Sequence, residues 1–274
     1  MSLQYFILVI ILLLGTYKCN AQVDSIARKG HHKFLLAFSS GVAIPVGTFA
    51  EFEVDPYKYP SNISGVAGTG FNARVQVVYL TSRNFGFSGM FYSSYNIAQD
   101  LHKVDLFSGP AKHGQGGGYY QQSYTYETSN WQSYSFLAGL VGVAYFDPAI
   151  INFRMSGGIQ YALSPESNLK EGGVIIDPPD FYRTNKYTVQ PSMTSYNYVI
   201  NLGVDFQVPI HNKWGIIMSV DYFTSHASFN GESKINTDYY DEPNKLYYES
   251  TTPTAFTKNY TMINFNLGAF YILK

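Results

Sequence analysis

The sequence has little charge and almost no cysteine. Charged residues make up 14% of its 274 residues, the formal net charge is -1, and Cys19 is the only cysteine. This balance gives no electrostatic reason to expect nucleic acid or a strongly anionic surface as the partner. After the N-terminal segment no apolar run approaches the length of about 18 residues that a membrane-spanning helix needs. The sequence therefore excludes a helical membrane protein and a disulfide scaffold.

Aromatic residues, in contrast to charged ones, are abundant in this sequence. They make up 17% of the chain, with 25 Tyr and 20 Phe, yet the mean hydropathy is only -0.10. A helical membrane protein would be far more hydrophobic overall, and a soluble enzyme would carry more Lys and Glu. Strands that alternate lipid-facing and lumen-facing residues average out to this intermediate value.

The N-terminus is typical of an export signal. Tyr5 to Leu14 is an apolar run of signal-peptide length, and small residues at Cys19-Asn20-Ala21 predict cleavage before Gln22. We therefore predict a signal peptide at 1–21 and a short periplasmic segment at 22–32. The first four residues contain no Lys or Arg, which departs from the usual signal. An alternative makes Cys19 a lipoprotein acylation site, although Tyr17-Lys18 fits that chemistry poorly.

The remainder of the chain alternates apolar and polar residues with a period of two. In the C-terminal segment, Phe265, Leu267 and Tyr271 lie on one face, while Asn264 and Asn266 lie on the other. Such runs last about nine to thirteen residues, and a tilted membrane strand needs about 9–11. The predicted strands are 33–46, 65–80, 84–97, 132–146, 150–164, 194–209, 214–229 and 257–273.

The connections between these segments alternate in length. Three are tight turns, at 81–83, 147–149 and 210–213. The four long connections are 47–64, 98–131, 165–193 and 230–256. Short turns at one end and long loops at the other are typical of bacterial outer-membrane barrels. We predict an all-β fold, an eight-stranded antiparallel up-and-down transmembrane β-barrel over 33–274, with the signal peptide cleaved and both termini periplasmic.

Aromatic residues gather near the predicted strand ends. Two interfacial girdles would explain this, because such rings place an apolar body in lipid and a polar tip in water. The alternative is the ordinary preference of Tyr and Phe for strands. The residues assigned to the girdles are Tyr79, Phe85, Tyr145, Trp131, Trp214 and Tyr222.

Four charged residues fall on the inward face of the predicted strands. They are Arg74, Arg154, Asp205 and Asp221. The interior of an eight-stranded barrel is about wide enough for side chains to fill it. Unpaired charges there lose hydration at a high cost, so we expect the four to pair in a lumen charge network. A proton path, an ion path or a gate is the functional alternative.

The segment Ser40–Phe52 resembles a known family. Gly41-Val42-Ala43-Ile44-Pro45-Val46-Gly47-Thr48-Phe49 matches the G-x-x-x-P-x-G-x-F pattern with which the Bacteroidota outer-membrane β-barrel family, including OmpA-type and PorT-like barrels, often begins. The resemblance implies an outer-membrane location and a barrel fold, and no particular activity. Lys274 departs from the aromatic residue that ends many barrels.

His226-Ala227-Ser228 suggests an enzyme. Both polar side chains are expected on the lipid-facing side near the extracellular end, and a His can activate a neighbouring Ser if an acidic residue orients it. Asp238 or Glu242 could take that role. The segment is similar to the H-x-S-N pattern of outer-membrane lipid A deacylases, except that Phe229 intervenes before Asn230. The other interpretation is a polar strand end.

The function that the sequence as a whole favours is non-enzymatic. We expect an integral outer-membrane barrel with a filled lumen and no diffusion pore, acting through its long extracellular loops. The alternatives are the lipid A acyl hydrolase, a subunit of a secretion or envelope-assembly complex, and a secreted soluble β-protein. Expected partners are outer-membrane lipid, lipopolysaccharide and a protein at the loops, not nucleic acid. No motif predicts a cofactor or a metal site.

Overall fold

A computed structural model describes most of the chain after residue 32. It covers residues 33–50, 66–99, 112–113, 119–146, 149–177, 180–211, 213–241 and 244–273. The predicted signal peptide, the periplasmic segment and Lys274 lie outside these ranges. Within the described ranges, no helix is both long enough and apolar enough to cross a bilayer.

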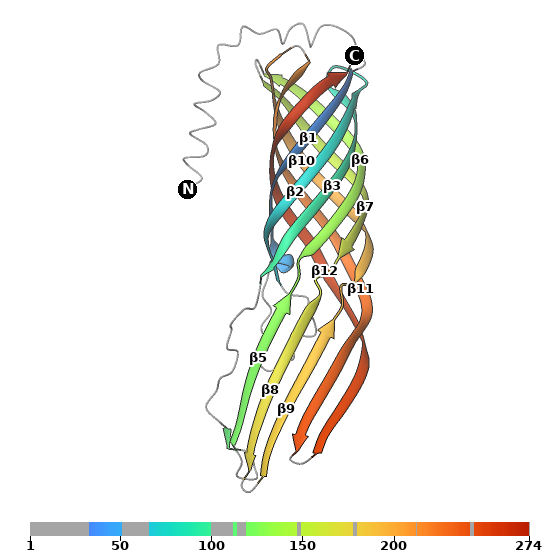
Figure 1. Cartoon of the computed structure of the whole chain (residues 1–274). Helices are drawn as coiled ribbons and strands as arrows, with labels where there is room; N and C mark the ends of the chain where they lie inside the picture. Colours follow the sequence, from blue (N-terminus) through green and yellow to red (C-terminus); the bar gives the residue numbers. More distant parts are fainter. Residues whose placement is uncertain are drawn as a thin grey trace.

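Eight strands form a closed antiparallel ring (Figure 1). They are β1 (Lys33–Pro45), β2 (Val66–Leu80), β3 (Phe85–Gln99), β6 (Trp131–Phe146), β7 (Ala149–Leu163), β10 (Thr194–Pro209), β11 (Trp214–Asp241) and β12 (Asn244–Leu273). Each pairs with its neighbour in chain order, and β1 closes the ring by pairing with β12 from Phe34↔Leu273 to Pro45↔Met262. This confirms the predicted eight-stranded up-and-down barrel.

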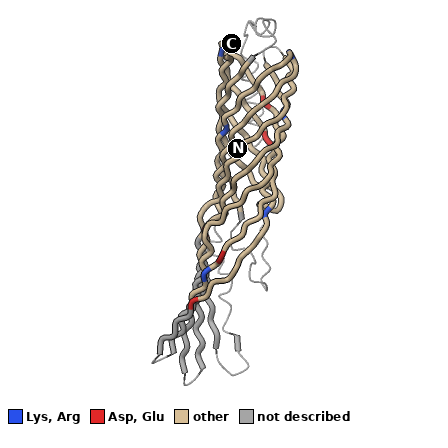
Figure 2. The backbone as a smooth tube through the Cα atoms, turned by 90° about the vertical axis from the view of Figure 1, so that its right-hand side faces the viewer, with Lys and Arg blue, Asp and Glu red and all other residues tan. Residues whose placement is uncertain are grey.

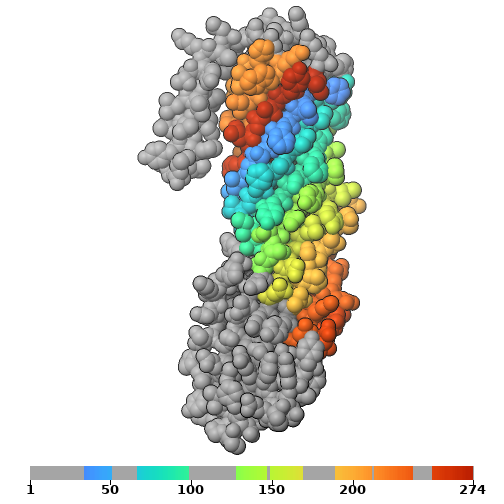
Figure 3. Space-filling model, viewed as in Figure 1, coloured from blue at the N-terminus to red at the C-terminus, as the bar shows by residue number. Residues whose placement is uncertain are grey.

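The period-two pattern separates an apolar exterior from a filled interior. On β10, Tyr198 is 88% exposed and Ile200 is 55% exposed, while the intervening Val199 is buried. Phe136 on β6 is 69% exposed. Figure 3 shows one face of this outer surface, crossed obliquely by neighbouring strands. Charged residues are sparse along the barrel (Figure 2). Polar backbone groups pair around the ring, so the exterior presents apolar side chains without an open sheet edge.

Three of the four predicted loops contain strands in their described residues. The added strands are β4 (Lys112–His113), β5 (Tyr119–Thr128), β8 (Ser167–Asp177) and β9 (Asp180–Gln190). They join the outer parts of β11 and β12 in a sheet of order β12-β11-β9-β8-β5-β4, which we call the sheet extension. It projects from the end of the barrel opposite the short turns (Figure 1). The prediction of loops at 98–131, 165–193 and 230–256 is therefore wrong over these strands. The β11–β12 hairpin continues beyond the ring, and β9, β8 and β5 pair side by side along it.

The fourth predicted loop, 47–64, begins with a short 3-10 helix. This helix, η1 (Gly47–Phe49), starts at Gly47, whose φ of 59° suits glycine. Ala50 closes the turn through a backbone hydrogen bond of 2.9 Å from its N–H to the Gly47 carbonyl oxygen. The side chain of Phe49 is fully buried. Residues 51–64 lie outside the described ranges.

Candidate functional site

The four charged residues of the lumen meet in the middle of the barrel. Arg74 lies on β2, Arg154 on β7, Asp205 on β10 and Asp221 on β11. All four side chains are at most 1% exposed. Since β2 and β10 occupy opposite sides of the eight-membered ring, the contact between Arg74 and Asp205 crosses the lumen.

Each guanidinium contacts both carboxylates. Arg74 donates from Nη1 to Asp221 at 2.9 Å and from Nη2 to Asp205 at 3.2 Å. Arg154 donates from Nε and Nη2 to Asp205 at 2.7 and 2.9 Å, and from Nη2 to Asp221 at 2.6 Å. Two positive and two negative charges thus neutralise one another, which offsets the loss of hydration. The structure brings together all four residues that the sequence assigned to the lumen.

Neutral side chains complete the hydrogen bonding of this network. Ser39 on β1 accepts from Arg74 Nε at 3.1 Å, and Asn266 on β12 donates to Asp221 at 3.1 Å. Asn201 donates to Asp221 and accepts from Arg154, both at 3.4 Å. The alternation of the C-terminal segment had already placed Asn266 on the polar face, whereas Ser39 was not among the residues predicted to lie in the lumen.

Gly203 makes room for the network. It lies on β10 directly between its register partners Arg154 on β7 and Asp221 on β11. A Cβ at this position would collide with the Asp221 carboxylate and the Arg154 guanidinium. Glycine therefore lets these two side chains meet across the intervening strand. A glycine at an inward strand position is the sequence signal for such a close approach.

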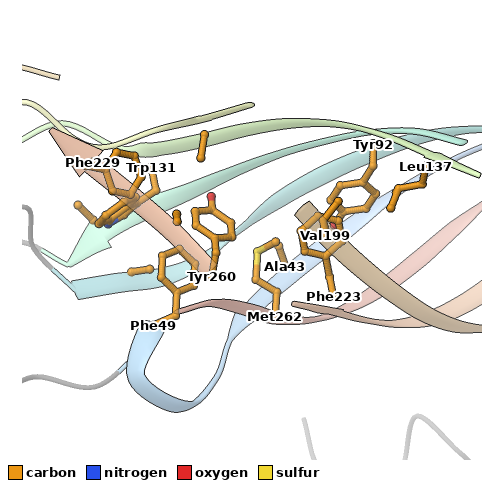
Figure 4. Close-up of a cluster of buried hydrophobic side chains, with 14 of the residues drawn as sticks. Ala43, Phe49, Tyr92, Trp131, Leu137, Val199, Phe223, Phe229, Tyr260 and Met262 are labelled. Carbon is orange, nitrogen blue, oxygen red and sulfur yellow. The ribbon is translucent and has the colours of Figure 1, made fainter. Parts of the chain in front are cut away.

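An apolar cluster fills the lumen between the network and the sheet extension. Its core is aromatic (Figure 4). Phe49 from η1 packs on Tyr260 and Trp131, with ring centroids 4.1 and 5.4 Å apart, and Trp131 packs edge-on against Phe229 at 5.8 Å. Nearer the network, Tyr92 stacks on Phe223 at 5.1 Å. We call this group the aromatic cluster.

The short-turn end of the lumen is also apolar. One buried group contains Val78, Val141 and Ile150, and another contains Ile217 and Phe270. The charged network thus lies between two apolar layers. The sequence pattern predicted the charge network but neither of these apolar layers.

The predicted interfacial aromatics have mixed outcomes. Trp214 and Phe85 lie outside near the short turns, 46% and 42% exposed. Tyr145 lies near the same turns but on the inward side of β6, packed against the buried group of Val78, Val141 and Ile150, and its hydroxyl donates to the Arg83 carbonyl oxygen at 2.9 Å. Tyr79 packs its ring against Phe34 with centroids 4.6 Å apart.

One further member of that set is placed differently from the prediction. Trp131 is fully buried in the lumen and belongs to the aromatic cluster, so its assignment to a girdle is wrong. Trp131 is the first residue of β6, and its side chain points inward. Side chains alternate along a strand, so an error of one residue in the strand assignment reverses the predicted side. Tyr222 faces outward, 43% exposed, three residues before the main-chain pairing of β11 with β10 ends at Ser225.

His226 and Ser228 do not form a catalytic pair in the described structure. Both are exposed on β11. His226 Nδ1 lies 2.7 Å from Asn259 Oδ1, so an amide occupies the place that a carboxylate would take in a catalytic triad. The main-chain N–H and carbonyl of Ser228 bond the Ser195 hydroxyl. The side chains of Asp238 and Glu242 lie outside the described part. Among the described residues, no group of His, Cys, Asp and Glu could hold a metal ion.

Comparison with known proteins gives distant structural likenesses. No protein-family model and no curated protein matches the chain. Among solved structures, it is similar to a major outer membrane protein from Thermus thermophilus, with 12% identity, 89% of this chain and 100% of that chain covered, and a TM-score of 0.38. Ail, the attachment invasion locus protein of Yersinia pestis, has 13% identity, coverages of 88% and 97%, and a TM-score of 0.35.

The outer membrane protein OprG from Pseudomonas aeruginosa has 12% identity, coverages of 88% and 95%, and a TM-score of 0.37. At such low identities and TM-scores the likenesses carry no functional information. The barrel is defined by the strand pairings of the chain itself. The class of protein so defined is an eight-stranded barrel with an apolar exterior and a side-chain-filled lumen.

Proposed function

We propose that this chain is a non-enzymatic integral protein of a bacterial outer membrane, whose barrel holds the sheet extension outside the cell for contact with a partner. The observation that carries the proposal is the apolar exterior of a closed barrel. Exposed apolar side chains of this extent have no favourable place in water, whereas the hydrocarbon of a bilayer accepts them.

The outer limit of the membrane can be read from β11. Its outward residues Trp214, Ile216, Val220 and Tyr222 are apolar or aromatic, and each is at least 40% exposed. From His226 to Lys234 the exposed outward residues are polar or charged. A change from apolar to polar on one face of a continuous strand is what a strand leaving the bilayer requires. The sheet extension lies wholly beyond this point.

The filled lumen argues against a pore as the function. An ion entering from either end meets an apolar layer and then a neutral network of four salt bridges that crosses the barrel. Moving a charge through such layers without hydration is costly. The part of the molecule available for recognition is therefore the sheet extension and its connections.

Surface labelling of single cysteines tests the location and orientation together. In a Cys19→Ser background, Ser250→Cys lies on the exposed outer part of β12, and Ser82→Cys lies in an exposed short turn at the opposite end. A membrane-impermeant maleimide should label position 250 on intact cells and position 82 only after lysis. The reverse labelling would refute the orientation. Recovery of the protein from the soluble fraction without detergent would refute the membrane location.

Partner contact requires a second experiment. Replacing residues 119–128, 167–190 and 232–252 by short turns removes most of the sheet extension and leaves the barrel strands intact. We expect the shortened barrel to keep its heat-modifiable mobility on gels and to lose partner capture in pull-downs from intact cells. Capture equal to that of the full chain would contradict a recognition role for the sheet extension.

A further inference from the structure

The sheet extension joins the barrel across three neighbouring gaps in the main-chain ladders (Figure 1). The pairs that flank the gaps are Thr128↔Ser167 and Gln132↔Leu163, Ser167↔Gln190 and Leu163↔Thr194, and Val189↔Lys234 and Val199↔Ser225. The first and second gaps share residues 164–166, and the second and third share residues 191–193. The gaps therefore lie side by side on one line that crosses the strands, which we call the junction row.

Serine side chains bridge the gaps where ladder bonds are missing. The bonds run from the Glu166 N–H to Ser129 Oγ at 2.7 Å, from the Met193 N–H to Ser164 Oγ at 2.9 Å, and from the Ser228 N–H to Ser195 Oγ at 3.1 Å. In the third gap the Asn197 amide also donates to the His226 carbonyl oxygen at 3.2 Å. Main-chain bonds of 2.8 Å remain from the N–H groups of Ser129 and Ser164. Rotation of a side chain releases a bridging bond, whereas a ladder bond moves only with the backbone.

Proline explains why the ladders stop at this row. Pro165 lies in the first two gaps, and Pro191 lies in the last two. Proline has no N–H to donate to a ladder, and sheets accept it only at edges, at strand starts and at bulges. The interruption is therefore written into the sequence on two neighbouring strands.

The third gap also contains a β-bulge. Ten steps lead from Val189 to Val199, whereas nine lead from Ser225 to Lys234 on the facing strand. One extra residue on one strand disrupts the pairing and bends that strand. The direction of the sheet therefore changes at the junction row.

Two strands cross the junction row without a break. β11 and β12 stay paired throughout, and where they pass the row they carry Gly231 and Pro253, one register position apart. Met193, in the second gap, lies so close to Gly231 that a Cβ there would be 2.9 Å from its methyl group. Glycine and proline both weaken the interior of a strand. The continuous ribbon is therefore also weakened at the junction row.

Apolar packing ends at the junction row too. The aromatic cluster reaches the row at Trp131 and Met193, and none of its described members lies farther out. Just beyond the row, Ser167 and Gln190 are fully buried, and neither the Ser167 hydroxyl nor the Gln190 amide has a hydrogen-bond partner in the described structure. Among the described residues no apolar core therefore ties the sheet extension to the barrel. A boundary with few buried apolar contacts is where a structure moves at low cost.

We propose that the junction row is a hinge, about which the sheet extension tilts as a unit relative to the barrel. Tilting needs rotation of the bridging side chains and bending of the β11–β12 ribbon at Gly231 and Pro253. The ladders on either side of the row and the charge network stay in place. The hinge lets a surface on the sheet extension meet a partner at different angles. It goes beyond the proposed function and does not depend on it.

Spin-label distances measured by pulsed electron paramagnetic resonance test the hinge. In a Cys19→Ser background, the full chain in detergent micelles carries labels at Phe71→Cys, on the outer face of β2, and at Thr184→Cys on β9, six residues beyond Gln190. Six strand residues span about 20 Å, so a tilt of about 30° moves the second label by about 10 Å. We expect the 71–184 distribution to be about 10 Å broader than that of Phe71→Cys with Ile200→Cys, both on the barrel.

Two pairs of substitutions change the hinge in opposite directions. Ser129→Ala with Ser195→Ala removes two bridging bonds and should raise the population of tilted forms about fivefold for each bond, the effect of losing one typical net hydrogen bond. Pro191→Thr with Pro253→Thr supplies two N–H groups and a residue that favours strands, and should narrow the 71–184 distribution.

Ser133→Ala is the matched control. Its buried hydroxyl bonds the Ser94 hydroxyl at 2.8 Å between β3 and β6, within a complete ladder. It should leave the 71–184 distribution unchanged. Thr184→Cys with Ser250→Cys reports on the sheet extension alone and should give a narrow distribution.

Each outcome decides for or against the hinge. A 71–184 distribution no broader than the 71–200 distribution means a fixed junction and overturns the hinge. Broadening that ignores both pairs of substitutions, or that changes equally in Ser133→Ala, overturns it as well. A 184–250 distribution as broad as the 71–184 distribution places the motion inside the sheet extension, with the same consequence. None of these results bears on cell-surface labelling or partner capture, so the hinge and the proposed function fail separately.

Discussion

Removing one carboxylate from the lumen network tests the energetic role of that network. Asp221→Asn keeps the shape of the side chain but deletes the charge that contacts Arg74 at 2.9 Å and Arg154 at 2.6 Å. Two guanidinium groups then share the single carboxylate of Asp205 in a buried site. Leaving a buried charge uncompensated in this way costs about 3–5 kcal/mol.

The assay is reversible urea unfolding in thin-bilayer liposomes, followed by tryptophan fluorescence. A double-mutant cycle isolates the ion pair. Arg74→Gln also unbalances the network, whereas Arg74→Gln with Asp221→Asn restores neutrality. We therefore expect the double variant to lose less free energy of unfolding than the sum of the two single losses. Additive losses, or a loss below about 1 kcal/mol for Asp221→Asn, would refute the reasoning.

Three further predictions concern packing and chemistry. Trp131→Ala should lower the free energy of unfolding by about 3–5 kcal/mol, because it empties the centre of the aromatic cluster, while Trp214→Ala outside the barrel should cost much less in the same assay. Gly203→Ala should cost about 1–3 kcal/mol, because its methyl group displaces the salt bridges, and a cost near zero would contradict the tight approach. His226→Ala and Ser228→Ala should leave the mass spectrum of lipid A unchanged when protein levels are equal; a lost or altered lipid A species would restore the enzymatic alternative.

The strands of the barrel could be predicted because their signal is local. Each barrel strand alternates apolar and polar residues, and the short turns fix their antiparallel order. The same alternation placed Arg74, Arg154, Asp205 and Asp221 inside. The pairing of these four side chains was then expected, because an unpaired charge in a narrow lumen costs free energy of hydration.

The sheet extension could not be predicted in the same way. Beyond the closed ring, no lumen has to be filled on one face of a strand, so the alternation fades at Glu232 and Thr252 although the strands continue. The pairing of β9 with β11 and of β5 with β8 depends on register between distant segments. Sequence pattern specifies such register weakly where no face is buried.

The prediction that Trp131 lies in an interfacial girdle was wrong for a different reason. The segment from Phe136 to Phe146 is apolar on both sides, because its inward residues Leu137, Val141 and Val143 belong to the apolar layers of the lumen. Because both faces of this strand are apolar, the sequence alone does not show which face points into the lumen. The apolar layers also explain why the lumen is less polar than the strand pattern suggested.

The two tryptophans offer the most direct test of the central claim, that the apolar exterior faces lipid and the lumen is filled. Trp214 is 46% exposed on the exterior, and Trp131 is fully buried in the lumen. In single-tryptophan variants made by Trp131→Phe and Trp214→Phe, bilayers with brominated acyl chains should strongly quench Trp214 and quench Trp131 far less. Equal quenching of both residues, or no quenching of Trp214, would contradict this description of the molecule.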